Sequence, residues 1–160
     1  MHTLLKLATC ITTLAMCALP LAGQGFGSGV AVHSNQVLVA ERGGPTSTGA
    51  VYVYEKGQDG WRVAKTIVPA GAEKGGSFGT SLSVSDNMML VGSPGASYVF
   101  KQIDGEWEEV ATLTSALVPD NLVFGLSGAI NGNVALVAAT NPGRYGGMST
   151  AGRVFAFEGK

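Results

Sequence analysis

The side chains that could perform acid–base chemistry are few in this sequence, and they are not arranged as a catalytic site. His33 falls in a polar segment without a nearby Ser or Cys pattern, so we expect an exposed turn residue rather than a general base. Glu106, Glu108 and Glu109 flank Trp107, and charges on an outer strand mostly discourage edge-to-edge pairing. We expect them to form a solvated face. The sequence therefore predicts a protein that is not an enzyme, with no catalytic residue.

Metal and cofactor chemistry also lacks its usual residues. A Ca²⁺ ion takes roughly six to eight oxygen ligands from closely spaced carboxylates and carbonyls. The short polar segments 33–36, 85–87 and 131–133 offer a single carboxylate, Asp86. The glycine-rich segment 25–29 imitates part of a dinucleotide-binding loop, but that loop must open a helix, whereas a strand is expected here. We predict no metal site and no cofactor.

Composition and charge restrict the class of protein further. The chain has 24 Gly and only 13% charged residues, which is typical of short strands joined by tight turns. Its formal net charge is −1, and its ten Lys and Arg residues are scattered singly. Because no basic stripe is present to neutralise phosphates, we expect no nucleic-acid partner.

Residues 1–23 have the pattern of a secretory signal peptide. Lys6 supplies an early cation, an apolar stretch runs over 7–19, and small residues follow near Ala22. The apolar stretch is about 13 residues long, shorter than the roughly 20 that a membrane-spanning helix requires. We therefore expect a secreted, periplasmic or cell-surface protein, with no transmembrane helix in the mature chain.

Both cysteines, Cys10 and Cys17, lie inside this signal segment, so the mature chain would contain no disulfide. Residues 14–17 resemble the signal of a bacterial lipoprotein, in which the cysteine carries the lipid. Met16 stands where a small residue would be expected, and for this reason we do not predict lipid anchoring at Cys17.

The rest of the chain contains an internal repeat, which is the strongest signal in the sequence. Three segments align without a gap from Phe26, Phe78 and Phe124, and each has Leu-Val at the same offset. An aromatic run follows in every copy, and a Trp follows that run in the first two. The segments are FGSGVAVHSNQVLVA, FGTSLSVSDNMMLVG and FGLSGAINGNVALVA.

Each copy is expected to form four short strands of an antiparallel sheet, because apolar residues alternate and Asn, Asp or Gly mark the turns. Repeats of about 40–50 residues with four strands are typical of β-propeller blades. The sequence thus predicts an all-β protein with blades at 26–77, 78–123 and 124–160. The third would lack its outer strand, leaving about two and three-quarter blades of an incomplete propeller.

An incomplete propeller leaves three alternatives. The chain is a fragment of a longer protein, it assembles with copies of itself or with partner blades, or it forms a short open stack. We favour the fragment narrowly.

The combination of Phe-Gly, Leu-Val-Gly-Ser-Pro-Gly-Ala and an aromatic strand resembles the FG-GAP repeat. This is the blade unit of integrin α-subunit propellers and of many secreted bacterial proteins. The resemblance extends from Phe26 to the end of the chain and is closest at 92–94, where Gly-Ser-Pro replaces Gly-Ala-Pro. Some blades of that family bind Ca²⁺ through a DxDxDG-type loop, which is absent here.

The loops predicted on one side of the blades are the candidate binding surface, because variable loops on a rigid scaffold usually carry binding residues. In the resembling family this side contacts protein ligands. The sequence therefore predicts an exported, non-enzymatic binding or adhesion module that recognises a protein or a surface glycan. The alternatives are an accessory propeller of a larger secreted protein, such as a hydrolase, and a structural component of a cell-surface assembly. The candidate residues are Arg42, Glu73, Lys74, Asp120, Arg144 and Tyr145.

Overall fold

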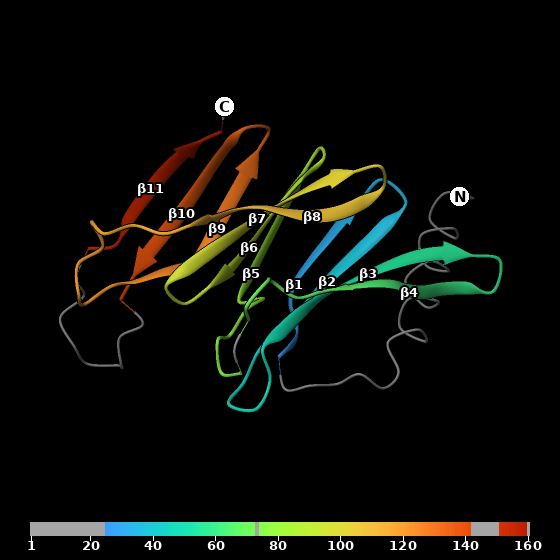
Figure 1. Cartoon of the computed structure of the whole chain (residues 1–160), viewed down its shortest axis with the longest axis horizontal. Coiled ribbons are helices and arrows are strands. Elements are labelled where there is room, and N and C mark those ends of the chain that lie inside the picture. Colours follow the sequence, from blue (N-terminus) through green and yellow to red (C-terminus); the bar gives the residue numbers. More distant parts are fainter. Residues whose placement is uncertain (1–24, 73, 142–150, 160) are drawn as a thin grey trace, which may run out of the picture.

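The computed structural model describes residues 25–72, 74–141 and 151–159, which form three antiparallel sheets and no helix (Figure 1). The prediction of an all-β protein is confirmed. No segment of these ranges is a helix long and apolar enough to cross a membrane. The signal peptide predicted at 1–23 lies outside the described residues.

Each sheet consists of strands that are consecutive in the chain and hydrogen-bonded in sequence order. The first and second sheets have four strands, and the third has three within the described residues. The first sheet contains β1 (Phe26–His33), β2 (Gln36–Arg42), β3 (Gly49–Gly57) and β4 (Gly60–Ile67). The second contains β5 (Ser81–Ser85), β6 (Met88–Ser93), β7 (Ala96–Ile103) and β8 (Glu106–Leu113), and the third contains β9 (Val123–Asn131), β10 (Val134–Thr140) and β11 (Arg153–Glu158).

Tight turns join the strands, and their residues explain why the chain reverses there. The first turn residue between the first two strands of each sheet has a left-handed backbone, at Ser34, Asp86 and Gly132. Asp104 and Gly105 both have positive φ, as a type I′ hairpin turn requires. Asp and Gly thus mark this turn, as the sequence indicated for the turns in general.

Each sheet has an aromatic face and an aliphatic face, because successive side chains of a strand point to opposite sides. In the first sheet, Tyr54 is paired with Val37 and Tyr52 with Val39, whereas Leu38 belongs to the opposite face. The same alternation recurs in the other sheets. The equivalent pairs are Phe100 with Met89, Tyr98 with Val91, Phe157 with Ala135, and Phe155 with Val137.

The sheets pack face to face in chain order, with β5 between β1 and β9 (Figure 1). The aromatic face of the second sheet covers the aliphatic face of the first, and the third covers the second in the same way. Leu38, Val51 and Val91 are fully buried between the first two sheets. Burying one such side chain contributes about 1.5–3 kcal/mol. Inter-sheet packing therefore makes a large contribution to the stability of the fold.

The repeated Phe-Gly pair forms the junction between successive sheets. The carbonyl oxygen of Phe78 accepts a hydrogen bond from the backbone N–H of Gly43 (3.1 Å), and that of Phe124 accepts one from Gly95 (2.8 Å). The glycine after Phe78 has a φ of +85°, and a Cβ atom there would lie 2.7 Å from the carbonyl oxygen of Glu41. Both the left-handed backbone and the close approach favour glycine at this position.

Candidate functional site

His33 is not an exposed turn residue, so that prediction is wrong. It is the last residue of β1, is half-buried, and is paired with Gln36 across the hairpin. Its ring lies edge-on to Trp107, with 5.8 Å between the ring centroids. The reason is that β1 extends to the end of the hairpin and the second sheet packs over it. His33 is therefore a packing residue at a sheet interface.

The glutamates of β8 are exposed, as predicted. Two of them also form polar contacts with β4 of the first sheet and with the connection that follows it. Glu106 forms an ion pair with Lys65 of β4. Glu109 accepts a hydrogen bond from the backbone N–H of Ala70 at 3.1 Å. Exposed ion pairs contribute about 0–1 kcal/mol, so the pair between Glu106 and Lys65 adds little to the stability of the fold.

Within the described ranges, no three His, Cys, Asp or Glu side chains are grouped so that they could hold a metal ion. The glycine-rich segment 25–29 leads into β1, as expected, and opens a strand rather than a helix.

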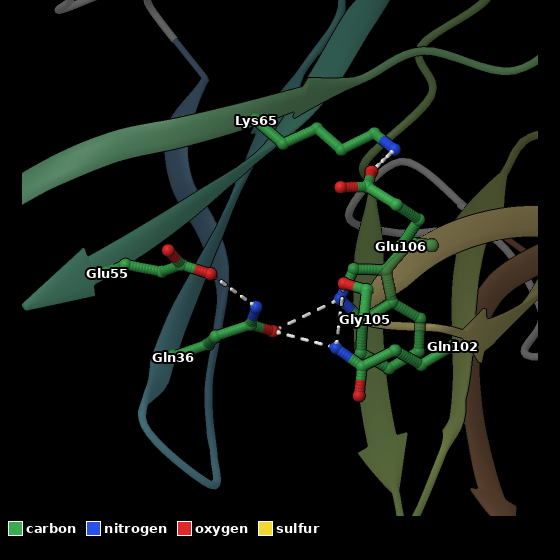
Figure 2. Close-up of polar contacts among 7 residues, drawn as sticks. Gln36, Glu55, Lys65, Gln102, Gly105 and Glu106 are labelled. Atoms are coloured by element: carbon green, nitrogen blue, oxygen red, sulfur yellow. Dashed lines mark hydrogen bonds and ion pairs between the residues drawn. The ribbon is translucent and has the colours of Figure 1, made fainter.

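A polar network lies along the cleft between the first and second sheets (Figure 2). Gln36 donates from Nε2 to Glu55 Oε1 (2.9 Å). Its Oε1 accepts from Trp107 Nε1 (3.3 Å) and from Gln102 Nε2 (3.4 Å). Trp107 is only 4% exposed. The network satisfies the polar atoms of a packed interface, in which Trp107 is a packing residue.

The loops of the first and second sheets meet at one end of the sheets. The backbone N–H of Gly75 donates to the carbonyl oxygen of Ser47 (3.1 Å), and that of Phe78 donates to Thr48 (3.1 Å). Ser93 Oγ donates to the carbonyl oxygen of Gly76. These bonds tie the β2–β3 loop, the β4–β5 connection and the end of β6 together. We call residues 42–48, 68–72, 74–80 and 93–96 the loop surface.

A pocket of about 230 Å³ lies in the loop surface. Tyr98 is its half-buried aromatic side chain, and Pro69 and Pro94 provide rigid apolar contacts. Thr48, which carries a hydroxyl group, also lines the pocket. The complete lining consists of Thr48, Pro69, Gly71, Ala72, Gly76, Phe78, Ser93, Pro94, Ala96 and Tyr98. An aromatic ring among prolines and hydroxyl groups suits contact with a single side chain or sugar ring.

The structure places only some of the predicted binding residues. Arg42 and Lys74 are exposed on the loop surface, but neither lines the pocket. Asp120 is exposed in the β8–β9 connection. Glu73, Arg144 and Tyr145 lie outside the described residues.

Sequence reasoning missed Tyr98, because its position in the aromatic strand indicated packing alone. The one signal for Tyr98 in the sequence was the short turn between β6 and β7, because a short turn leaves the start of β7 beside the loops.

Tyr52, on the aromatic face of the first sheet, has a raised pKa. Burial is the main cause, and its hydroxyl group also donates to Glu41 Oε2 at 2.6 Å. Together these effects raise the pKa of Tyr52 to about 12. At neutral pH the phenol therefore stays protonated and acts as a hydrogen-bond donor, not as a base.

Comparison of the chain with protein-family models, with curated proteins and with solved structures finds no match. A fold alone does not determine a function, so the function is inferred from the geometry of the loop surface.

Proposed function

We propose that this chain is an exported, non-enzymatic binding or adhesion module whose loop surface recognises a protein or a cell-surface glycan. The observation that carries this proposal is the pocket at the junction of loops from two sheets. Backbone hydrogen bonds hold these loops on a rigid sheet scaffold, which lowers the entropy cost of ordering them when a ligand binds.

The size of the pocket limits what it could accept. Its volume of about 230 Å³ is below the roughly 300–1,000 Å³ that is common for small-molecule sites. It would hold one side chain or one sugar ring of a larger ligand that also contacts the surrounding loops. The exposed cations Arg42 and Lys74 favour a ligand with acidic groups.

We further propose that the three sheets are consecutive blades of a β-propeller, of the type that the FG-GAP resemblance implies. Face-to-face packing in chain order and a Phe-Gly pair at each junction support this arrangement. Export through residues 1–23 belongs to the same proposal. Cell fractionation tests it, since the full chain should leave the cytoplasm and a chain lacking these residues should remain there.

Binding is tested with the full chain on a glycan array and against surface proteins of the source cells. The informative variant is the double substitution Arg42→Ala and Lys74→Ala, because both side chains are exposed and their removal leaves the packing intact. We expect binding to weaken about three- to tenfold, as for peripheral charges that favour an acidic ligand.

Lys56→Ala is the matched control, since Lys56 is an exposed cation near the β3–β4 turn, away from the loop surface. It should leave binding unchanged. Equal weakening by the control and by the double variant, or no bound ligand in either screen, would refute the proposal.

A further inference from the structure

A cleft of about 670 Å³ lies between the outer strands of the second and third sheets. It is lined by apolar side chains that include Met88, Val99 and Phe157, with Lys101 and Glu158 among its polar residues. The equivalent cleft between the first and second sheets measures about 330 Å³. The two clefts can be compared residue by residue, because the sheets are copies of one repeat.

The smaller cleft contains the side chain that the larger one lacks. Trp107, on the fourth strand of the second sheet, lines it and donates to Gln36 of the first sheet. In the larger cleft, Met88 occupies the position of Gln36, because both follow the Asn of the first turn and begin the second strand. Within the described residues, β11 is the last strand of the third sheet, so no fourth strand brings an aromatic ring onto Met88.

The backbone of β11 offers hydrogen bonds along this edge. The N–H of Gly159 donates to the carbonyl oxygen of Asn133 at 2.8 Å. Gly159 and Asn133 are therefore a hydrogen-bonded pair at the end of the antiparallel ladder between β11 and β10. Because antiparallel pairs alternate, the backbone groups of Val154, Ala156 and Glu158 point away from β10. An edge of this kind is a template for another strand.

The register of the complete sheets shows where an incoming aromatic residue would lie. Trp107 is paired with Gln102, whose N–H donates to Asn87 at 2.8 Å. Gly159 makes the same bond to Asn133 and is therefore the counterpart of Gln102. An aromatic residue opposite Gly159 would place its ring in the cleft, against Met88, and thioether–aromatic contacts are favourable.

The residue after the aromatic one would lie opposite Glu158. In the first sheet, Trp61 is followed by Arg62, which is paired with Glu55. In the second sheet the charges are exchanged, since Glu108 is paired with Lys101. Both four-stranded sheets thus place opposite charges on the two residues paired at this position. By the same rule, a cation in the incoming strand would be favourable opposite Glu158.

We propose that the edge of β11 and the adjoining cleft form a binding site for an extended segment of a partner protein. The segment adds antiparallel to β11, inserts a large aromatic side chain into the cleft and places Lys or Arg opposite Glu158. This site is separate from the loop surface, so the proposal does not depend on the function inferred above.

The test uses synthetic peptides and the full chain in isothermal titration. The first probe is the β4 sequence GWRVAKTI, which has Arg directly after Trp. Two further probes carry the substitutions Trp61→Ala and Arg62→Glu. We expect saturable binding of the first peptide, a loss of about tenfold or more for Trp61→Ala, and a loss of about two- to fivefold for Arg62→Glu.

Two variants of the chain make the result specific. Glu158→Lys, at an exposed position, should reverse the preference, so that the Arg62→Glu peptide binds more tightly. Ala156→Pro removes an outward N–H and should abolish binding, with circular dichroism confirming that the sheets persist. As a control on the first sheet, Lys56→Ala should leave peptide binding unchanged. Failure of the first peptide to saturate, or an unchanged preference in Glu158→Lys, would overturn the proposal.

Discussion

Gly27, Gly79 and Gly125 have nearly the same left-handed backbone, with φ between +84° and +86°, but different surroundings. A Cβ atom at Gly125 would lie 2.2 Å from the carbonyl oxygen of Ser93 and 2.3 Å from that of Ala96. At Gly27 nothing would lie within 4 Å. Substitution by Ala at Gly27 and Gly125 therefore separates the cost of the backbone conformation from the cost of holding two sheets together.

The expected magnitudes follow from these distances. A left-handed conformation costs an L-residue about 1–2 kcal/mol, and this cost applies equally to Gly27→Ala and Gly125→Ala. Forcing a methyl group into the backbone of the neighbouring sheet adds about 1–3 kcal/mol at Gly125 alone. We therefore expect Gly125→Ala to lower the free energy of unfolding by about 1–3 kcal/mol more than Gly27→Ala.

Urea unfolding followed by tryptophan fluorescence and far-ultraviolet circular dichroism measures this difference. Melting temperatures should separate in the same direction, by roughly 2–4 °C for each kcal/mol. Equal destabilisation by the two substitutions would refute the reasoning, because it would mean that the Phe-Gly pair sets the backbone conformation without joining the sheets.

Two further predictions concern buried aromatic side chains. Trp107→Phe removes the donor to Gln36 and leaves a gap, so it should lower the free energy of unfolding by about 1–3 kcal/mol in urea titrations; Trp61→Phe, at a half-buried position, should cost less, and the reverse order would contradict the assigned packing. Tyr52, with a pKa of about 12, should titrate later than an ordinary tyrosine in ultraviolet absorbance, and Glu41→Gln should lower its pKa. Between pH 10 and about 12, the folded state keeps the Tyr52 proton and the unfolded state releases it. The contribution of the protonated Tyr52 to the free energy of unfolding is therefore fully present below pH 10 and is lost as the pH rises to about 12. Titration of every tyrosine near pH 10 would exclude it.

Much of the fold was predictable because its strands pair over short distances in the sequence. The alternation of apolar residues predicted the strands, and in β3 it places Tyr52 and Tyr54 on one face, paired with Val39 and Val37. Turn residues such as Asp104 marked the hairpins for a local reason, namely the left-handed backbone that they tolerate. The number of strands in each sheet followed from the repeat in the same way.

The candidate site was less predictable, because residues distant in the chain build it. Arg42, at the end of β2 rather than in a loop, and Lys74 are exposed, but the pocket beside them includes Tyr98 from another sheet. His33 was assigned to a turn, and only the packing of the second sheet shows that it contacts Trp107. These side chains meet through stacking of whole sheets, for which a strand pattern carries no information.

The sequence by itself thus determined the repeat, the strands and the two faces of each sheet, since these depend on alternation and turn chemistry within one repeat. Only the tertiary structure decided which face covers which, where the loops form a pocket and where a cleft remains open beside β11. The physical reason is that these features arise from close packing between sheets. The carbonyl oxygen of Phe78, for example, accepts a hydrogen bond from Gly43, in the loop between β2 and β3 of the first sheet.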